Sequence, residues 1–233
     1  MKVFINGGGA GKQTVRALQR LNEVIDHGLP CLYIPLAMDE NKYDDCYEWI
    51  CGELCGVQIP AIEMVRSAEE LSCKNLSMYS FIFIGGGNTF KLLHDIKRVG
   101  MFEPIHEYLK NGGVAFGGSA GAIIFGEDLE SCKLDDDNEV GLTETNGFDV
   151  LHGVSFLCHF TNRSEEHDRR NEEYLLKLSG HRKIIALPEE VTLFLNEDKL
   201  EEITDKPYYV FESGIKKTKP ESFSEAAYGR SCR

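Results

Sequence analysis

The sequence lacks any long hydrophobic run, and none of its windows approaches the roughly 20 apolar residues that a membrane-spanning helix needs. Its first residues, MKVFINGGGAGK, lack the apolar segment of a secretory signal, so we expect a cytoplasmic protein with no membrane partner. Basic clusters are also missing. The chain has 25 Lys and Arg residues against 38 Asp and Glu residues, a net charge of −13. Phosphate binding needs concentrated positive charge, so we expect no nucleic-acid partner.

Cysteine is too sparse for a disulfide scaffold, with eight residues in a chain of 233. The closest group, Cys46, Cys51 and Cys55, has the spacing C-x4-C-x3-C, which does not fit the usual paired zinc-ligand spacings. These intervals place the three near one face of a helix, and we interpret them as buried free thiols. We expect no metal and no organic cofactor.

The phosphate-binding motifs are incomplete. The segment GGGAGK at residues 7–12 lacks the glycine at Asn6 and the hydroxyl at Gln13 that a P-loop requires. It also lacks the third glycine of a dinucleotide fingerprint, where Lys12 stands. We interpret this segment as a strand-to-helix turn near the rim of a site.

What the chain does contain is an alternation of short apolar strands and amphipathic helices. Runs such as KVFIN, SFIFIG and GVAFGG are separated by segments of helical periodicity, which predicts an α/β fold with a parallel sheet flanked by helices. The later runs KIIALP, VTLFLNED and PYYVFESG predict an antiparallel extension in the C-terminal part. We expect a single domain over residues 1–233, with the last 15 or so residues loosely ordered.

Two glycine-rich turns follow predicted strands, at the sheet edge where α/β proteins bind ligands. The first, GGGNT at residues 85–89, lets the backbone approach a ligand closely, and Asn88 is a candidate substrate-binding residue. Asn88 or Thr89 could equally be an ordinary helix N-cap.

The second turn, GGSAG at residues 117–121, matches the nucleophile-elbow pattern G-x-S-x-G. It predicts that Ser119 stands exposed on a sharp turn, with the N–H of Ala120 aimed at a developing oxyanion. Gly87 is the candidate for a second oxyanion donor. The alternative is a flexible turn that contains a serine by chance.

A serine nucleophile needs a base, and His159 is the best placed, because it follows an apolar run that would end a strand at the sheet's rim. An imidazole among Cys158 and Phe160 could also be a satisfied core residue. Glu189, after the strand in ALPEE, is the candidate orienting carboxylate. Four acids of the polar loop at residues 127–147 are alternatives: Asp135, Asp136, Asp137 and Glu139.

These segments together carry a family resemblance. IGGGNTFKLL, GGSAGA, GFDVL, HFTN and LPEE resemble, in order and approximate spacing, serine peptidase family S51, the peptidase E aspartyl dipeptidases. The resemblance covers residues 30 to 195 and implies a class I glutamine amidotransferase-like, flavodoxin-like fold. It implies that Ser119 is the nucleophile, His159 the base, and Gly87 and Ala120 the oxyanion donors. It matches Glu189 to the third triad position and, more loosely, Glu139 to a second acid important for activity.

The resemblance also implies a substrate, a short peptide with an N-terminal aspartate. Recognition of that side chain requires a cation, preferably an arginine that forms a bidentate pair. The segment at residues 163–170 offers three, of which Arg170 is favoured although it does not align without a gap. The sequence therefore predicts a serine exopeptidase that acts as a monomer or homodimer. A cyanophycinase-like hydrolase of β-Asp-Arg units and a catalytically silent binding module are the alternatives.

Overall fold

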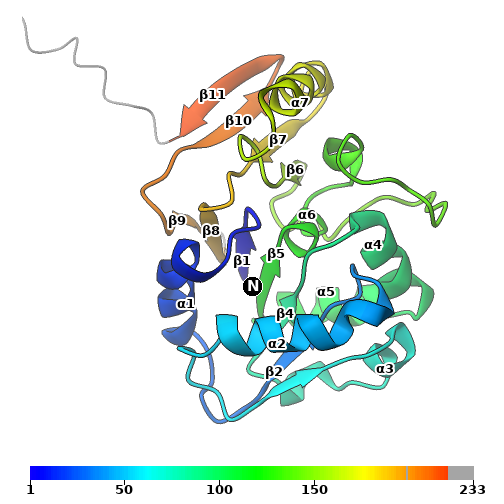
Figure 1. Cartoon of the computed structure of the whole chain (residues 1–233), viewed down its shortest axis with the longest axis vertical. Helices are drawn as coiled ribbons and strands as arrows, with labels where there is room; N and C mark the ends of the chain where they lie inside the picture. Colours follow the sequence, from blue (N-terminus) through cyan, green and yellow to red (C-terminus); the bar gives the residue numbers. More distant parts are fainter. Residues whose placement is uncertain (198, 220–233) are drawn as a thin grey trace, which may run out of the picture.

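Two sheets form the framework of the protein (Figure 1). In this computed structural model residues 1–197 and 199–219 are described, and the expectation of a loosely ordered C-terminus concerns residues outside them. Within those ranges the larger sheet has the strand order β3-β2-β4-β5-β1-β8-β9, and the smaller sheet has the order β11-β10-β7-β6.

The strands are β1 (Lys2–Asn6), β2 (Cys31–Ile34), β3 (Ile62–Met64), β4 (Phe81–Ile84), β5 (Val114–Gly118), β6 (Val154–Leu157), β7 (Lys183–Ala186), β8 (Thr192–Asn196), β9 (Lys199–Glu202), β10 (Tyr208–Glu212) and β11 (Ile215–Lys219). The α-helices are α1 (Val15–Asn22), α2 (Tyr43–Glu53), α3 (Ala68–Ser72), α4 (Thr89–Arg98), α5 (Phe102–Lys110), α6 (Ala120–Ile123) and α7 (Glu165–Leu178). Single 3-10 turns lie at Gly11–Gln13, Glu40–Lys42, Leu76–Met78 and Glu130–Cys132.

The five strands from β1 to β5 are parallel, as the apolar runs predicted. In space these strands follow the order β3-β2-β4-β5, which is the order of the first four strands of a flavodoxin-like sheet. Strand β1 pairs with β5 at the end of the parallel set. The α/β fold with a sheet flanked by helices is confirmed. Because the strands are parallel, their C-terminal ends meet at one edge of the sheet.

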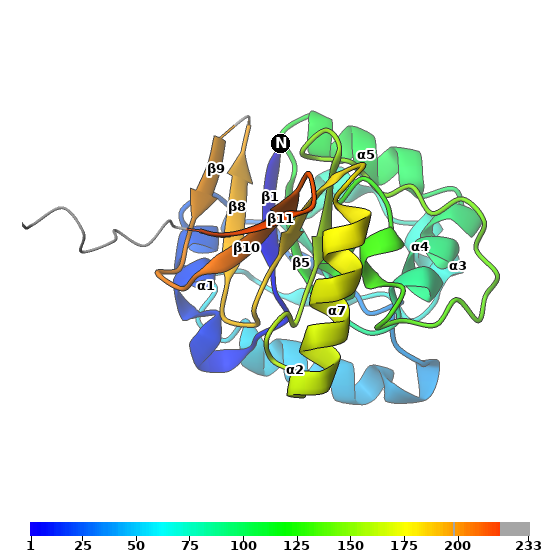
Figure 2. The ribbon, with the colours of Figure 1, turned by 90° about the horizontal axis from the view of Figure 1, so that it is seen from above.

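Alternate residues of each strand build two separate cores. On one face, Phe4, Phe83, Phe116 and Phe194 pack against the apolar sides of α1 and α2. On the other face, isoleucine, leucine, valine and alanine side chains of the same strands pack against α3, α4 and α5. Figure 2 shows these two groups of helices on opposite sides of the sheet. Continuous burial explains why the strands are apolar on both faces.

The C-terminal part adds antiparallel strands, as expected. Strand β8 runs antiparallel to β1, β9 to β8, and β10 to both β7 and β11. Strands β6 and β7 are parallel to each other, with Leu157 beside Ala186 at their C-terminal ends. The segments that follow β6 and β7 therefore start from neighbouring points.

The interpretation of the cysteines as buried thiols is only partly correct. Cys46 is buried, but Cys51 and Cys55 are exposed. Five residues turn an α-helix by about 500°, so Cys51 lies well away from the face of Cys46, and α2 ends at Glu53 before Cys55 is reached. Within the described ranges, no helix is both long and apolar enough to cross a membrane.

The turn from β5 into α6 depends on two glycines. A Cβ atom on Gly117 would lie 2.3 Å from the carbonyl oxygen of Gly121. A Cβ atom on Gly121 would lie 2.1 Å from the carbonyl oxygen of Ile84 in β4. The backbones of β5, α6 and β4 are therefore in direct contact at these two positions, and only glycine fits there.

We expect Gly121→Ala to lower the free energy of unfolding by about 1–3 kcal/mol, because the methyl group must push β4 and α6 apart. Gly52→Ala is the matched control. Gly52 lies in α2 with nothing within 4 Å of an added Cβ, so alanine there should stabilise by up to about 1 kcal/mol. Urea unfolding followed by circular dichroism measures both, and equal midpoints for the wild type and Gly121→Ala would contradict the packing argument.

Candidate active site

Three polar side chains form a hydrogen-bonded chain at the C-terminal edge of the parallel strands. Ser119 Oγ lies 2.8 Å from His159 Nε2, and His159 Nδ1 lies 2.9 Å from Glu189 Oε1. The imidazole and the Glu189 carboxylate keep only 23% and 33% of their side-chain surface exposed, so solvent screens their contact incompletely.

The partners fix how the imidazole can serve a nucleophile. An ionised carboxylate only accepts hydrogen bonds, so Nδ1 carries the proton that is donated to Glu189. Nε2 is then the unprotonated nitrogen and accepts the hydroxyl proton of Ser119. This is the arrangement that a general base needs before attack.

The backbone of Ser119 is strained. Its φ of 54° and ψ of −116° lie outside the regions that non-glycine residues favour, at a cost on the order of 1–3 kcal/mol. Surrounding hydrogen bonds hold this conformation: Ser119 N–H donates to Asn6 O at 3.2 Å, and Ser119 O accepts from the N–H of Ala122 at 2.8 Å. The strain is what points the hydroxyl away from the strand and toward His159.

A second nucleophile lies nearby but is inert. Cys158 is buried, and its thiol donates to the carbonyl oxygens of Asn6 and Ser119 at 3.6 and 3.5 Å. Burial raises the pKa of the Cys158 thiol far above its usual range, so no thiolate forms there. The serine is the reactive group of the pair.

The parallel pairing of β6 with β7 brings His159 and Glu189 together. His159 follows the end of β6 by two residues, and Glu189 follows the end of β7 by three. His159 also has a positive φ of 56°, and its N–H donates to Gly7 O at 2.9 Å. The side chain of Asn162 accepts from Glu189 N–H at 2.8 Å and ties the two segments together.

The turn at Gly7–Gly9 packs directly on these two segments. A Cβ atom would lie 1.9 Å from Pro188 O at Gly7, 2.3 Å from His159 Cε1 at Gly8, and 2.4 Å from Glu189 O at Gly9. Side chains there would displace both triad segments. The GGGAGK segment thus borders the site, as its interpretation as a turn near the rim anticipated, and its glycines serve the triad.

Two backbone N–H groups beside Ser119 are free to bind an oxyanion. Within the described part of the chain, neither Gly87 N–H nor Ala120 N–H has a hydrogen-bond acceptor. Gly87 has a φ of 134°, and its turn is held by Asn88 N–H, which donates to Ala37 O at 2.9 Å. The neighbouring Gly86 contacts Ser119, whose Cβ would lie 3.1 Å from an added Cβ. The two turns expected to supply donors are therefore adjacent.

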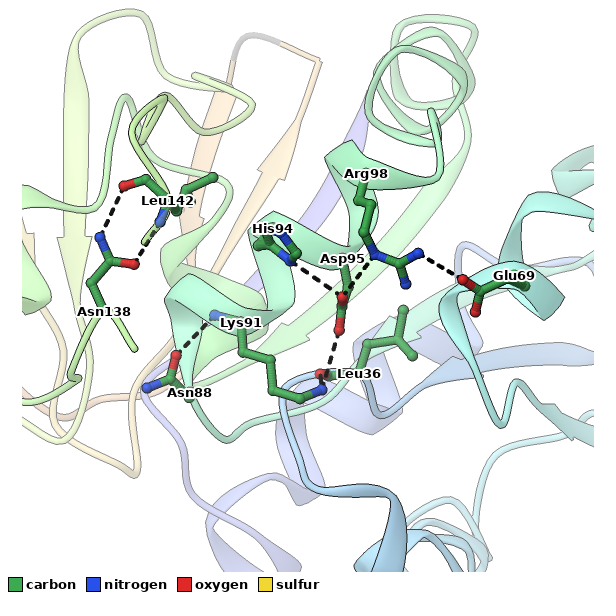
Figure 3. A network of polar contacts seen from close by, with 9 residues as sticks. All are labelled: Leu36, Glu69, Asn88, Lys91, His94, Asp95, Arg98, Asn138 and Leu142. Atoms are coloured by element: carbon green, nitrogen blue, oxygen red, sulfur yellow. Dashed lines mark hydrogen bonds and ion pairs between the residues drawn. The ribbon is translucent and has the colours of Figure 1, made fainter. Parts of the chain in front are cut away.

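Asn88 is occupied in capping the helix that follows. Its Oδ1 accepts from Lys91 N–H at 2.9 Å, and its Nδ2 donates to Asp137 O at 2.8 Å. Figure 3 shows Asn88 and Lys91 at the start of α4, with Lys91 Nζ bonded to Leu36 O and Asp95. The structure brings Asn88 beside the catalytic segment, with both ends of its side chain already bonded to the protein.

The acids of the loop at residues 127–147 attach that loop to two helices. Asp135 accepts from His167 and Asn171 of α7. Asp136 accepts from the N–H of Thr89 at 2.8 Å and from its hydroxyl. Burial raises the pKa of Asp136, while the bonds from Thr89 lower it. Neither carboxylate is bonded to His159.

Among the described residues, no hydrogen bond or ion pair links Glu139 to the triad. It is exposed and lines a second, smaller cavity of about 270 Å³ together with Gly87, Asn88 and Lys91. The structure thus places Glu189, and not Glu139, against the imidazole.

Arg170 does not reach the site. It is exposed on α7, and no arginine lines the cavity beside Ser119 among the residues that the structure describes. Arg169 is paired with Glu173 at 2.8 Å on the same helix. Arg170 as the residue that binds a substrate carboxylate therefore stays a prediction.

A cavity of about 480 Å³ that the sequence did not reveal opens beside Ser119, His159, Gly86 and Gly87. Its walls include the aromatic residues Tyr33, Trp49, Phe83 and Phe116. No signal in the sequence marked them, since each belongs to an ordinary apolar strand or helix pattern.

Across residues 1–197 and 199–219, no group of three His, Cys, Asp or Glu side chains could hold a metal ion.

Comparison with known proteins identifies the family of the chain. The family model of Peptidase family S51 matches residues 3–203. Peptidase E of Nostoc sp. is 28% identical over 195 residues, covering 79% of this chain and 76% of that protein. Peptidase E of Salmonella newport is 27% identical over 184 residues, covering 71% and 77%.

Two solved structures share the fold. A candidate peptidase E from Listeria monocytogenes superposes with a TM-score of 0.68 at 21% identity, over 86% of this chain and 96% of that one. A peptidase from an acI-B1 Actinobacterium superposes with a TM-score of 0.72 at 16% identity, over 95% and 94%. Since the family match spans nearly the whole chain, this protein belongs to peptidase family S51 and is a serine peptidase.

Proposed function

We propose that the protein is an exopeptidase that hydrolyses short peptides, above all dipeptides, through an acyl-enzyme on Ser119. The observation that carries the proposal is the unbroken chain from Ser119 Oγ through His159 to Glu189, set beside two free N–H groups. The peptidase E names of the relatives in Nostoc and Salmonella support hydrolysis of peptide bonds.

The first half of the reaction forms the acyl-enzyme. Ser119 Oγ attacks the scissile carbonyl carbon while its proton passes to His159 Nε2. The carbonyl oxygen becomes an oxyanion that accepts hydrogen bonds from the N–H groups of Gly87 and Ala120. The intermediate then collapses, the C–N bond breaks, and His159 gives its Nε2 proton to the leaving amine.

The second half releases the acid. A water molecule gives a proton to His159 Nε2 as its oxygen attacks the acyl carbon, and the resulting oxyanion occupies the same two N–H groups. Collapse breaks the bond to Ser119 Oγ, which recovers the proton from His159. Glu189 stays ionised throughout and stabilises the imidazolium that forms in each half.

Among the residues that the structure describes, no arginine lines the cavity beside Ser119. The aspartate preference implied by the resemblance rests on Arg170, which is exposed on α7 away from the cavity. The proposal therefore gives peptide hydrolysis first, and an N-terminal aspartate only as the substrate residue that the resemblance implies.

We expect Ser119→Ala to lower the rate of dipeptide hydrolysis by about 10⁴-fold or more, because no other group can form the acyl-enzyme. Release of free leucine from Ala-Leu, Phe-Leu and Asp-Leu, separated by chromatography, measures it, with circular dichroism confirming that the variant is folded. Wild-type cleavage that survives the substitution would remove Ser119 from the nucleophile's role.

We expect Glu189→Gln to lower kcat on the order of 10⁴-fold, because the amide N–H can face Nδ1 and leave His159 in the wrong tautomer. Glu190→Gln changes the same charge one residue away and is the matched control, expected to stay within about threefold of wild type. Glu139→Gln tests the rival carboxylate. A large loss with Glu139→Gln and none with Glu189→Gln would reverse the assignment.

A further inference from the structure

A buried asparagine at the end of β1 lies between the nucleophile and its base. Asn6 is only 1% exposed, and it lines the same cavity as Ser119 and His159. In the sheet it stands beside Gly118 of β5, the residue before the nucleophile, and beside Thr192 of β8. An amide buried at such a place costs free energy unless its oxygen and nitrogen are both hydrogen-bonded.

The partners of Asn6 fix the orientation of its amide. Oδ1 accepts from Gly8 N–H at 2.9 Å, and Nδ2 donates to Thr192 Oγ1 at 2.9 Å. Because a backbone N–H can only donate, a flipped amide would place two donors against each other at Gly8. The carbonyl oxygen of Asn6 accepts from Ser119 N–H at 3.2 Å. One residue therefore binds β8, the glycine turn and the backbone of the nucleophile.

Gly8 connects Asn6 to the base. Its φ of 106° is a conformation that glycine adopts without strain. A Cβ atom on Gly8 would lie 2.3 Å from Cε1 of His159 and 2.5 Å from its Nε2. The backbone of Gly8 is therefore packed against the part of the imidazole that carries Nε2. The ring cannot move toward the turn as long as Asn6 holds Gly8 in this place.

We infer that Asn6 is a positioning residue for the catalytic imidazole. Its side chain holds Gly8 against His159 and so keeps Nε2 in line with Ser119 Oγ, while its carbonyl oxygen holds Ser119 N–H. The inference rests on the proposed function and adds one residue to the groups that support it. Asn6 acts on the reaction through Gly8 and Ser119, so its loss lowers the rate of the chemical steps and leaves the affinity for the substrate.

A pair of substitutions at Asn6 tests this role with the peptide among Ala-Leu, Phe-Leu and Asp-Leu that wild-type protein cleaves fastest. Asn6→Ala removes both side-chain bonds, and we expect kcat to fall about 100-fold with KM within about threefold, because a small displacement of a catalytic group has effects of this size. Asn6→Asp keeps an acceptor for Gly8 N–H and accepts from the Thr192 hydroxyl, so it should recover at least about 10-fold of that loss. A kcat of Asn6→Ala within about twofold of wild type would overturn the inference.

Asn22 supplies the matched control. Its side chain also makes two hydrogen bonds between segments, to Gly56 O at 3.0 Å and from Gln58 N–H at 2.8 Å, and it does not line the cavity. Asn22→Ala should lower the urea midpoint and leave kcat within about twofold of wild type, because it shares no partner with the site. Equal losses of kcat in Asn22→Ala and Asn6→Ala would reduce the role of Asn6 to general stability and overturn its assignment.

NMR of isotope-labelled protein tests the same claim without a substrate. In wild-type protein we expect the His159 ring to carry its proton on Nδ1 and the Gly8 amide to be protected from exchange. In Asn6→Ala the Gly8 amide should exchange at least about 10-fold faster, since it has lost its acceptor. The ring should show both tautomers, because Glu189 no longer fixes one. An unchanged tautomer and unchanged Gly8 exchange would overturn the inference.

The proposed function and the role of Asn6 fail in different ways. If wild-type protein hydrolyses none of the three peptides, the exopeptidase function is wrong, and the NMR measurement still decides whether Asn6 holds the ring. If wild-type protein hydrolyses them and Asn6→Ala does so equally fast, the function stands and the inference on Asn6 is wrong.

Discussion

The site depends on the backbone contact between the glycine turn at Gly7–Gly9 and the segments that carry His159 and Glu189. Ser119 belongs to the larger sheet, whereas His159 and Glu189 follow strands of the smaller sheet. The turn holds the two parts in register through Gly9 N–H, which donates to Glu189 O, and Gly7 O, which accepts from His159 N–H. A side chain at any of these glycines would separate the nucleophile from its base.

The same construction leaves room for a substrate. The turns at Gly7–Gly9 and Gly86–Gly87 consist of glycines, so no side chains from them fill the space beside Ser119. The aromatic residues of the core on one sheet face then reach the sheet edge and line the cavity. The core that stabilises the fold thus also lines the cavity beside Ser119, and Phe83 belongs to both.

Most of the fold and the centre of the site could be predicted from the sequence. Apolar runs predicted the parallel strands, and G-x-S-x-G predicted the elbow at Ser119 because close packing leaves few residue choices there. The short helix α3 and the mostly exposed strands β9 and β11 have weak sequence patterns and were not predicted, and neither was α5. Trp49 and the cavity escaped prediction for another reason: which face of α2 covers the strand ends is a property of packing, invisible in a local pattern.

The central claim is that Ser119 is a nucleophile activated by His159 and oriented by Glu189. Reaction with a small fluorophosphonate, followed by mass spectrometry of the digested protein, tests it without any assumption about the substrate. The account predicts one phosphonyl adduct, located on Ser119, that forms far more slowly when Glu189 is changed to glutamine. Labelling of another residue, or a rate unaffected by that change, would contradict it.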